Sequence, residues 1–130
     1  MKFSELIKEA DWKSEKHVPV IEAPASVKAG DVFEVKVSVG KEIAHPNTTE
    51  HHIRWIQLYF KPNSEQAMYE LGKFDFNAHG EAVKGANQGP AYTEPVASVR
   101  VKLTEAGELI AVSYCNIHGV WQSNVPISVG

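Results

Sequence analysis

The chain has 130 residues, of which 43% are hydrophobic and 22% charged, and its formal net charge is -3. This length suits one domain whose core needs no disulfide, so we expect a single domain over residues 1–130. Acidic and basic residues are interspersed without a basic stripe, and no apolar segment approaches the length of a membrane span, so we expect neither nucleic-acid binding nor membrane insertion.

The N-terminal segment is predicted to be a short amphipathic helix over residues 3–10. Its apolar side chains recur at helical spacing, at Phe3, Leu6, Ile7 and Ala10. Charged residues interrupt the segment, so it lacks the continuous apolar stretch of a secretory signal. Cys115 is the only cysteine and cannot form an internal disulfide, which is typical of a reducing compartment. We therefore expect a cytoplasmic protein.

After this segment the apolar residues alternate with polar ones, a period of two that predicts half-buried strands. The expected strands are residues 33–39, 53–60, 68–76, 99–103, 108–114 and 125–129. Glycine and proline separate them. About seven short strands without an internal repeat predict an all-β sandwich. Residues 77–95 are expected to form a long loop, and loops of this length are usually functional.

Residues with metal-binding chemistry lie in the breaks between the expected strands. Cys115 and His118 directly follow the apolar run of residues 109–114. A thiolate and an imidazole three residues apart can bind one metal ion. The alternative is that Cys115 is a small buried apolar side chain and His118 an ordinary loop residue.

Two further segments supply imidazoles. His45, His51 and His52 lie within eight residues of one another before the strand at 53–60, and His17 lies in a charged segment. Each segment alone is also compatible with a polar surface loop. Together they offer more ligands than a closed tetrahedral zinc site takes, which favours a redox metal. Imidazole suits iron, copper and zinc, so ligand type alone leaves the metal open.

Three strings, EKHVP at 15–19, HPNTTEHHIRW at 45–55 and SYCNIHG at 113–119, resemble the iron-site segments of the superoxide reductases, also called neelaredoxins. The similarity includes NAHGE at 77–81. It implies an enzyme that reduces superoxide to hydrogen peroxide at a mononuclear iron cycling between Fe²⁺ and Fe³⁺. With the strand count, it implies an immunoglobulin-like seven-stranded β-sandwich or barrel with a short N-terminal helix. Two-iron members carry an additional cysteine-rich domain. Cys115 is the only cysteine of this chain, which therefore resembles the one-iron type.

The resemblance also implies a role for each matched residue. Four equatorial imidazoles and one axial thiolate would surround the iron and leave a sixth position open. These ligands would be His17, His45, His51, His118 and Cys115. Glu15 would close the site as a ligand of ferric iron, and Lys16 would lie beside the open position.

The remaining histidines are expected to have structural roles. Neighbouring strand residues point to opposite faces, so His52 is expected to pack while His51 points inward. For His79 we expect a hydrogen-bonded structural role.

The resemblance further implies an external electron donor of the rubredoxin type and a homotetramer. The main alternative is a cupredoxin-like copper electron-transfer protein, because a β-sandwich with Cys and His in a late loop also describes that class. Such a site usually takes an axial methionine, but only Met1 and Met68 are present, neither of them after His118. A structural zinc site or a plain binding module would leave the fifth ligand without a role.

Overall fold

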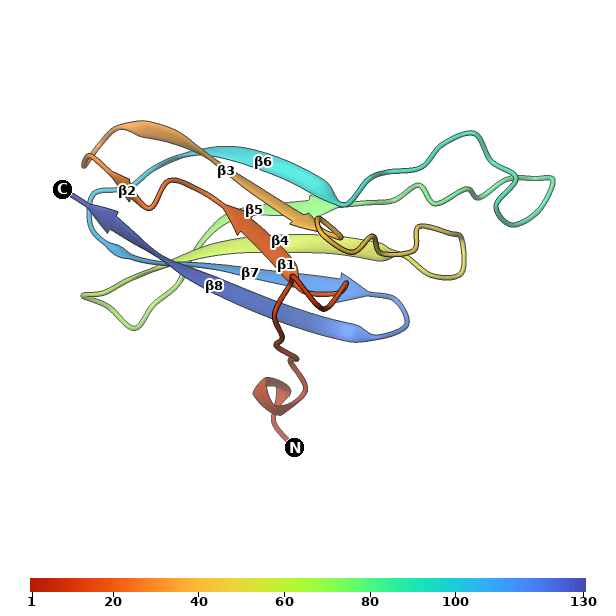
Figure 1. The fold of residues 1–130 in the computed structure, drawn as a ribbon, viewed down its shortest axis with the longest axis horizontal. Coiled ribbons are helices and arrows are strands. Elements are labelled where there is room, and N and C mark those ends of the chain that lie inside the picture. The colour runs from red at the N-terminus through yellow and green to blue at the C-terminus, as the bar shows by residue number, and fades with distance from the viewer.

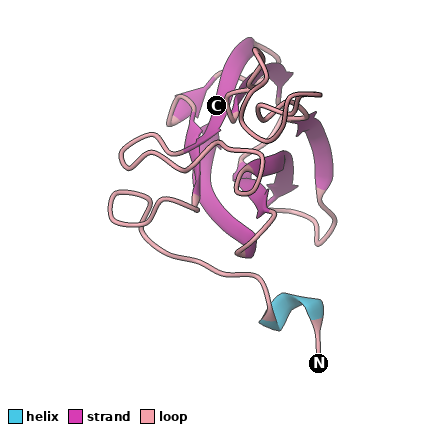
Figure 2. Ribbon diagram, turned by 90° about the vertical axis from the view of Figure 1, so that its right-hand side faces the viewer, coloured by secondary structure: helices cyan, strands magenta, loops and turns pink.

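The computed structural model describes residues 1–130 and shows an all-β chain of eight strands in two open sheets (Figure 1, Figure 2). The strands are β1 (Pro19–Glu22), β2 (Ser26–Val27), β3 (Val32–Val39), β4 (Ile53–Pro62), β5 (Tyr69–Asp75), β6 (Val96–Lys102), β7 (Gly107–Cys115) and β8 (Gly119–Val129). One sheet has the order β1-β3-β6 and the other β2-β8-β7-β4-β5. Neighbouring strands are antiparallel except β2, which pairs in parallel with β8. The prediction of an all-β sandwich is thus confirmed, without a closed barrel.

The core lies between the two sheets, because alternate residues of each strand point inward. Burial alternates along β4 and β7, the two central strands of the larger sheet. Fourteen buried residues form one cluster across both sheets, and its fully buried members include Val35, Val37, Ile56, Leu58, Leu109 and Ala111.

Three loops gather at one end of the sandwich, on the right of Figure 1, and two of them hold expected site residues. They are residues 40–52 between β3 and β4, residues 77–95 between β5 and β6, and residues 116–118 between β7 and β8. The last is a tight connection, in which Cys115 pairs with Gly119. Gly119 has φ of +84°, a left-handed conformation that favours glycine.

The prediction of a helix over residues 3–10 is wrong beyond its first turn. The only helix is a three-residue 3₁₀ segment, η1 (Phe3–Glu5). At Lys8 the backbone N–H donates to the carbonyl of Val120, and the Lys8 carbonyl accepts from the N–H of Gln122. Pairing with β8 extends the chain there, and so short a helix is not stable alone. No helix has the length and apolar character needed to cross a bilayer.

The prediction of seven strands is also wrong, since the structure has eight. The sequence pattern missed β1 and β2, which are too short to show an alternation. It also began β8 too late, at residue 125, because residues 119–124 are largely polar. Along these residues the backbone pairs with β7, and this pairing does not depend on the type of side chain. The other five strands lie within a few residues of the predicted ranges, and residues 77–95 are the long connection that we expected.

Candidate metal centre

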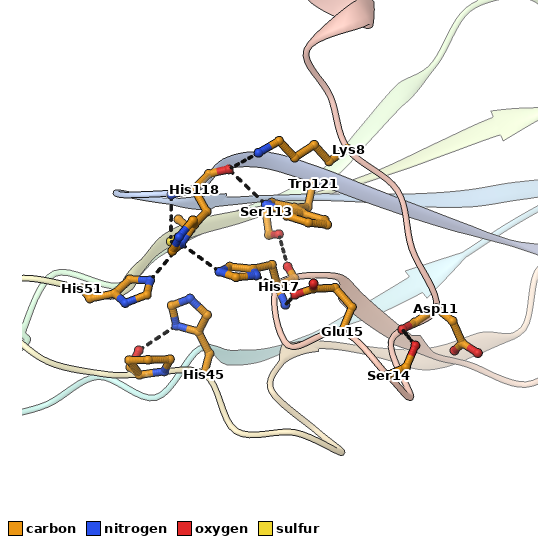
Figure 3. A network of polar contacts seen from close by, with 12 residues as sticks. Lys8, Asp11, Ser14, Glu15, His17, His45, His51, Ser113, His118 and Trp121 are labelled. Atoms are coloured by element: carbon orange, nitrogen blue, oxygen red, sulfur yellow. Dashed lines mark hydrogen bonds and ion pairs between the residues drawn. The ribbon is translucent and has the colours of Figure 1, made fainter.

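Four of the predicted ligands meet at the loop end of the sandwich. Ligand atoms of His17, His45, His51 and Cys115 all lie within 4.8 Å of one another. His17 precedes β1, Cys115 ends β7, and the other two come from the β3–β4 loop. Figure 3 shows the three imidazoles converging from two segments, the one before β1 and the β3–β4 loop. The fold therefore brings together residues that are almost 100 positions apart in the sequence.

The fifth predicted ligand, His118, lies at the edge of this group. Its Nδ1 is 3.0 Å from Nε2 of His17, 3.2 Å from Nε2 of His51 and 3.7 Å from Sγ of Cys115. The backbone N–H of His118 also donates to Sγ of Cys115, at 3.3 Å. The β7–β8 turn thus places the sulfur and Nδ1 of His118 side by side, as their three-residue spacing predicts.

The ring of His17 is oriented by Glu15. Oε1 of Glu15 lies 2.6 Å from Nδ1 of His17 and accepts a hydrogen bond of 2.8 Å from its backbone N–H. Burial by itself raises the pKa of Glu15, but the hydrogen bonds from His17 outweigh it and hold that pKa below its ordinary value. The carboxylate accepts, so Nδ1 carries the proton and Nε2 presents its lone pair to the other ligand atoms.

His45 provides the strongest sign that the group fits a metal ion. Its Nδ1–H donates to the carbonyl of Pro46 at 2.7 Å, while Nε2 is buried and has no hydrogen-bond partner. Leaving a buried polar atom unpaired costs roughly 1 to 3 kcal/mol. Burial, together with the charges of His17, His51 and Lys16, lowers the pKa of His45 to about 4. The ring is therefore neutral at pH 7, with a free lone pair that a bound cation would satisfy.

Two further imidazoles of the group, those of His17 and His51, also have lowered pKa values. Burial is the main cause of the lowered pKa of both His17 and His51, and neighbouring positive charge adds to it. Ring nitrogens 3.0 to 3.2 Å apart repel one another when both present lone pairs, unless a proton or a cation lies between them. Imidazole nitrogens with one sulfur are ligands that suit iron, copper or zinc. The donor set therefore fits a single redox-capable metal ion.

The group is buried on one side and open on the other. Cys115 is 0% exposed and His17 is 6% exposed, whereas His118 is an exposed residue. The positive charge of Lys16 contributes to the lowered pKa of three of the histidines, so Lys16 acts electrostatically on the site. Glu15, by contrast, is directed at Nδ1 of His17, which faces away from the other donor atoms.

His52 and His79 lie outside this group. Their rings stack on each other, with centroids 3.5 Å apart and planes 4° apart. Nδ1 of His52 hydrogen-bonds with the carbonyl of Thr48, and Nε2 of His79 with that of Phe76. Met68 lines an apolar pocket on another face, beside Phe3, so it offers no axial ligand for copper.

Several supporting residues were not predicted from the sequence. The Ser113 hydroxyl donates to the backbone carbonyl of His17 at 3.1 Å, while Trp121 Nε1–H and Lys8 Nζ donate to that of His118 at 3.2 and 3.3 Å. Alternation along β7 places Ser113 on the same face as Cys115, a signal that could have found it. Lys8 reaches the site through the pairing of the N-terminal segment with β8, for which the sequence has no local sign.

Comparison with known proteins agrees with this geometry. The family model described as desulfoferrodoxin matches residues 9–124. The chain is 53% identical to neelaredoxin of Megalodesulfovibrio gigas (99% of each chain) and 54% identical to superoxide reductase of Pyrococcus furiosus (95% of this chain, 98% of that protein). It is also similar to the structure of superoxide reductase (neelaredoxin) from Archaeoglobus fulgidus in the reduced form, with a TM-score of 0.88 and 54% identity over 95% of this chain and 98% of that one.

Proposed function

This chain belongs to the desulfoferrodoxin family of superoxide reductases, and we propose that it holds one iron ion through five side chains. These ligands are His17, His45, His51, His118 and Cys115. The observation that carries the assignment is the convergence of their donor atoms, which includes a buried and otherwise unpartnered Nε2 of His45. The donor types alone would also suit copper, but Met68 lies on another face, and the relatives named above are a neelaredoxin and a superoxide reductase.

The reaction adds one electron and two protons to superoxide and yields one hydrogen peroxide. The bound iron supplies that electron. Cys115, when bound as a thiolate, donates electron density to the metal, a known way of tuning how iron binds and releases oxygen ligands. The imidazoles of His17 and His45 are held in one tautomer by Glu15 and the Pro46 carbonyl, so their free nitrogens are already directed at the site.

Lys16 and Glu15 act beside the ligands. Lys16 offsets the net charge of -3 next to the site and so attracts the superoxide anion. Glu15 holds the Nδ1 proton of His17. To become a ligand of the oxidised metal, its carboxylate would have to leave that ring, which would break the 2.6 Å contact.

After each turnover an electron must return to the site. The chain has one cysteine, already used as a ligand, so it cannot build a second redox centre of the cysteine-ligated kind. We assign this role to an external, rubredoxin-like donor. It would approach at the exposed side of the site, where His118 and Ile117 reach the surface.

The finer description of fold and location is part of the same proposal. Two mostly antiparallel sheets packed face to face support an immunoglobulin-like sandwich. One core cluster spanning both sheets supports a single iron-binding domain over residues 1–130. A lone unpaired cysteine supports a cytoplasmic location.

A homotetramer is supported by an apolar outer face on the larger sheet. There, Phe3 is 66% and Met68 53% exposed, beside a pocket of about 320 Å³ that the half-buried aromatic side chains of Trp55 and Tyr59 help to line. Apolar patches of this kind usually mark an interface, and a second copy of the chain would cover this one. Sedimentation equilibrium of the iron-loaded protein should give four chains per particle, and a monomer at micromolar concentration would reject the assignment.

The function is tested by the stoichiometry of superoxide consumption. Iron-loaded, reduced protein is mixed with a limited pulse of superoxide, and hydrogen peroxide and dioxygen are both measured. A reductase yields one hydrogen peroxide per superoxide and no dioxygen, with one electron withdrawn from the protein. A dismutase would release one dioxygen for every two superoxide ions, and that result would overturn the proposal.

A further inference from the structure

Among the proposed ligands, His51 has the least support for its ring. Glu15 holds His17, and the Pro46 carbonyl holds His45, but the ring of His51 hydrogen-bonds only with another proposed ligand, His118. The position of this ring therefore depends on its backbone. That backbone is fixed by a small turn, in which Thr48 N–H donates to the carbonyl of His51 and the His51 N–H donates to Oγ1 of Thr48.

One asparagine of the long β5–β6 loop forms hydrogen bonds with this turn. Oδ1 of Asn87 accepts from the N–H of Thr49 at 2.8 Å, and the Asn87 N–H donates to Oγ1 of Thr49 at 3.1 Å. Nδ2 of Asn87 donates to both carboxylate oxygens of Glu50, at 3.1 and 2.9 Å. A single side chain and its own amide thus hold the two residues that precede His51.

The loop is built to hold Asn87 in place. Its two branches pair through Gly80 N–H to the Ala91 carbonyl and Gly89 N–H to the Gly80 carbonyl, at 3.0 and 2.9 Å. A Cβ at Gly89 would lie 2.3 Å from the carbonyl oxygen of Glu81, so the branches are in close backbone contact. Asn87 itself has φ of +62°, a left-handed conformation that few residues other than Gly, Asn and Asp adopt readily.

We propose that Asn87 is a positioning residue of the metal site, which clamps the turn at residues 48–51 and so fixes where His51 can bind the metal. The inference rests on the proposed function, because it takes His51 as a ligand. It gives a role to the loop at residues 77–95, which contributes no ligand of its own. Fixing a metal ligand through a residue outside the ligand set is typically worth roughly 10 to 100-fold in affinity.

The test measures loss of Fe²⁺ from the loaded protein to an excess of a coloured chelator under anaerobic conditions. Asn87→Gly removes the side chain while keeping a residue that tolerates the left-handed backbone. Asn63→Gly is the matched control, at an exposed asparagine near the opposite end of β4. We expect iron release about 10-fold faster in Asn87→Gly and unchanged in Asn63→Gly. Equal release from Asn87→Gly and the parent would overturn the inference.

A rescue experiment separates positioning from general damage to the loop. Asn87→Asp alone sets a carboxylate against Glu50 and should release iron quickly. Combined with Glu50→Gln it restores a donor opposite an acceptor, with the two roles exchanged, and should return the rate toward that of the parent. Failure of this rescue would contradict the clamp. His51→Gln serves as the reference: if it releases iron no faster than the parent, the ligand assignment itself is wrong and the inference falls with it.

Discussion

Trp121 lies flat against His17, with ring centroids 5.0 Å apart and ring planes 12° apart. Its indole N–H also donates to the carbonyl of His118, so one side chain contacts two proposed ligands.

We expect Trp121→Phe to keep the stacking but lose the hydrogen bond, at a cost of about 1 kcal/mol in the free energy of unfolding. Trp121→Ala should cost about 3 to 5 kcal/mol and weaken iron binding. Urea unfolding and iron affinity of both variants check this, and an alanine variant equal to the parent in both would contradict it.

Glu15 is expected to have two roles that two substitutions can separate. Glu15→Ala removes the acceptor for His17 Nδ1, so iron affinity should fall roughly 10-fold, and it removes the carboxylate that closes the ferric site, so the ferric spectrum should change. Glu15→Gln keeps an acceptor for His17 but has no charge. It should restore the affinity without restoring the ferric spectrum. Superoxide reduction per bound iron should stay fast in both variants. If parent and variant ferric spectra coincide at every pH, Glu15 does not bind ferric iron.

Lys16 is expected to guide superoxide to the site. Positive charge at a site entrance can raise association rates by roughly 10 to 1000-fold, and salt weakens the effect. Lys16→Ala should therefore slow the second-order reaction with superoxide and flatten its salt dependence, with iron content unchanged. Lys61→Ala is the control, because Lys61 lies at the end of β4 that is far from the site. Pulse-radiolysis rates at low and high salt decide between them, and equal rates for the two variants would reject the guiding role.

His17 and His79 are both buried histidines, but only the first lies among the donor atoms. His17→Gln should lose iron, because it removes a ligand nitrogen. His79→Gln should keep one iron per chain and lose only about 1 kcal/mol of stability, since its ring contacts are hydrogen bonds to Asn47 and Phe76 and a stack on His52. Iron analysis after purification compares the two variants. Equal iron losses would show that the assignment of His17 as a ligand and His79 as a structural residue is wrong.

The sequence predicted the strands that alternate between an apolar and a polar face. Val35 of β3 is an example, because it is buried between the exposed Glu34 and Lys36. It could not predict that Lys8 pairs with Trp121, since that pairing brings together segments over 100 residues apart. The apolar pattern at Phe3 and Leu6 produced only the short 3₁₀ segment η1 in place of the helix predicted over residues 3–10, and both side chains are exposed.

The site residues were predicted through motifs, and the geometry adds how each is held. Cys115 and His118 are close in sequence and could be paired from spacing alone. The tautomers of His17 and His45 could not, because they depend on contacts with Glu15 and the Pro46 carbonyl. The role of Asn87 could not be predicted for a further reason. It lies in a loop without periodicity, and only the folded loop brings it to Thr49.

The central claim is that Cys115 and the histidines hold one iron. Its most direct test is metal analysis with the visible spectrum of oxidised protein, for the parent, Cys115→Ser and the control Ala111→Ser, which adds a buried hydroxyl elsewhere on the same face of β7. We predict one iron per chain in the parent and a thiolate-to-iron charge-transfer band in the parent and the control. The band and most of the superoxide reductase turnover should be lost in Cys115→Ser, with the fold retained. Stoichiometric copper or zinc in the parent, or an unchanged band in Cys115→Ser, would contradict the account.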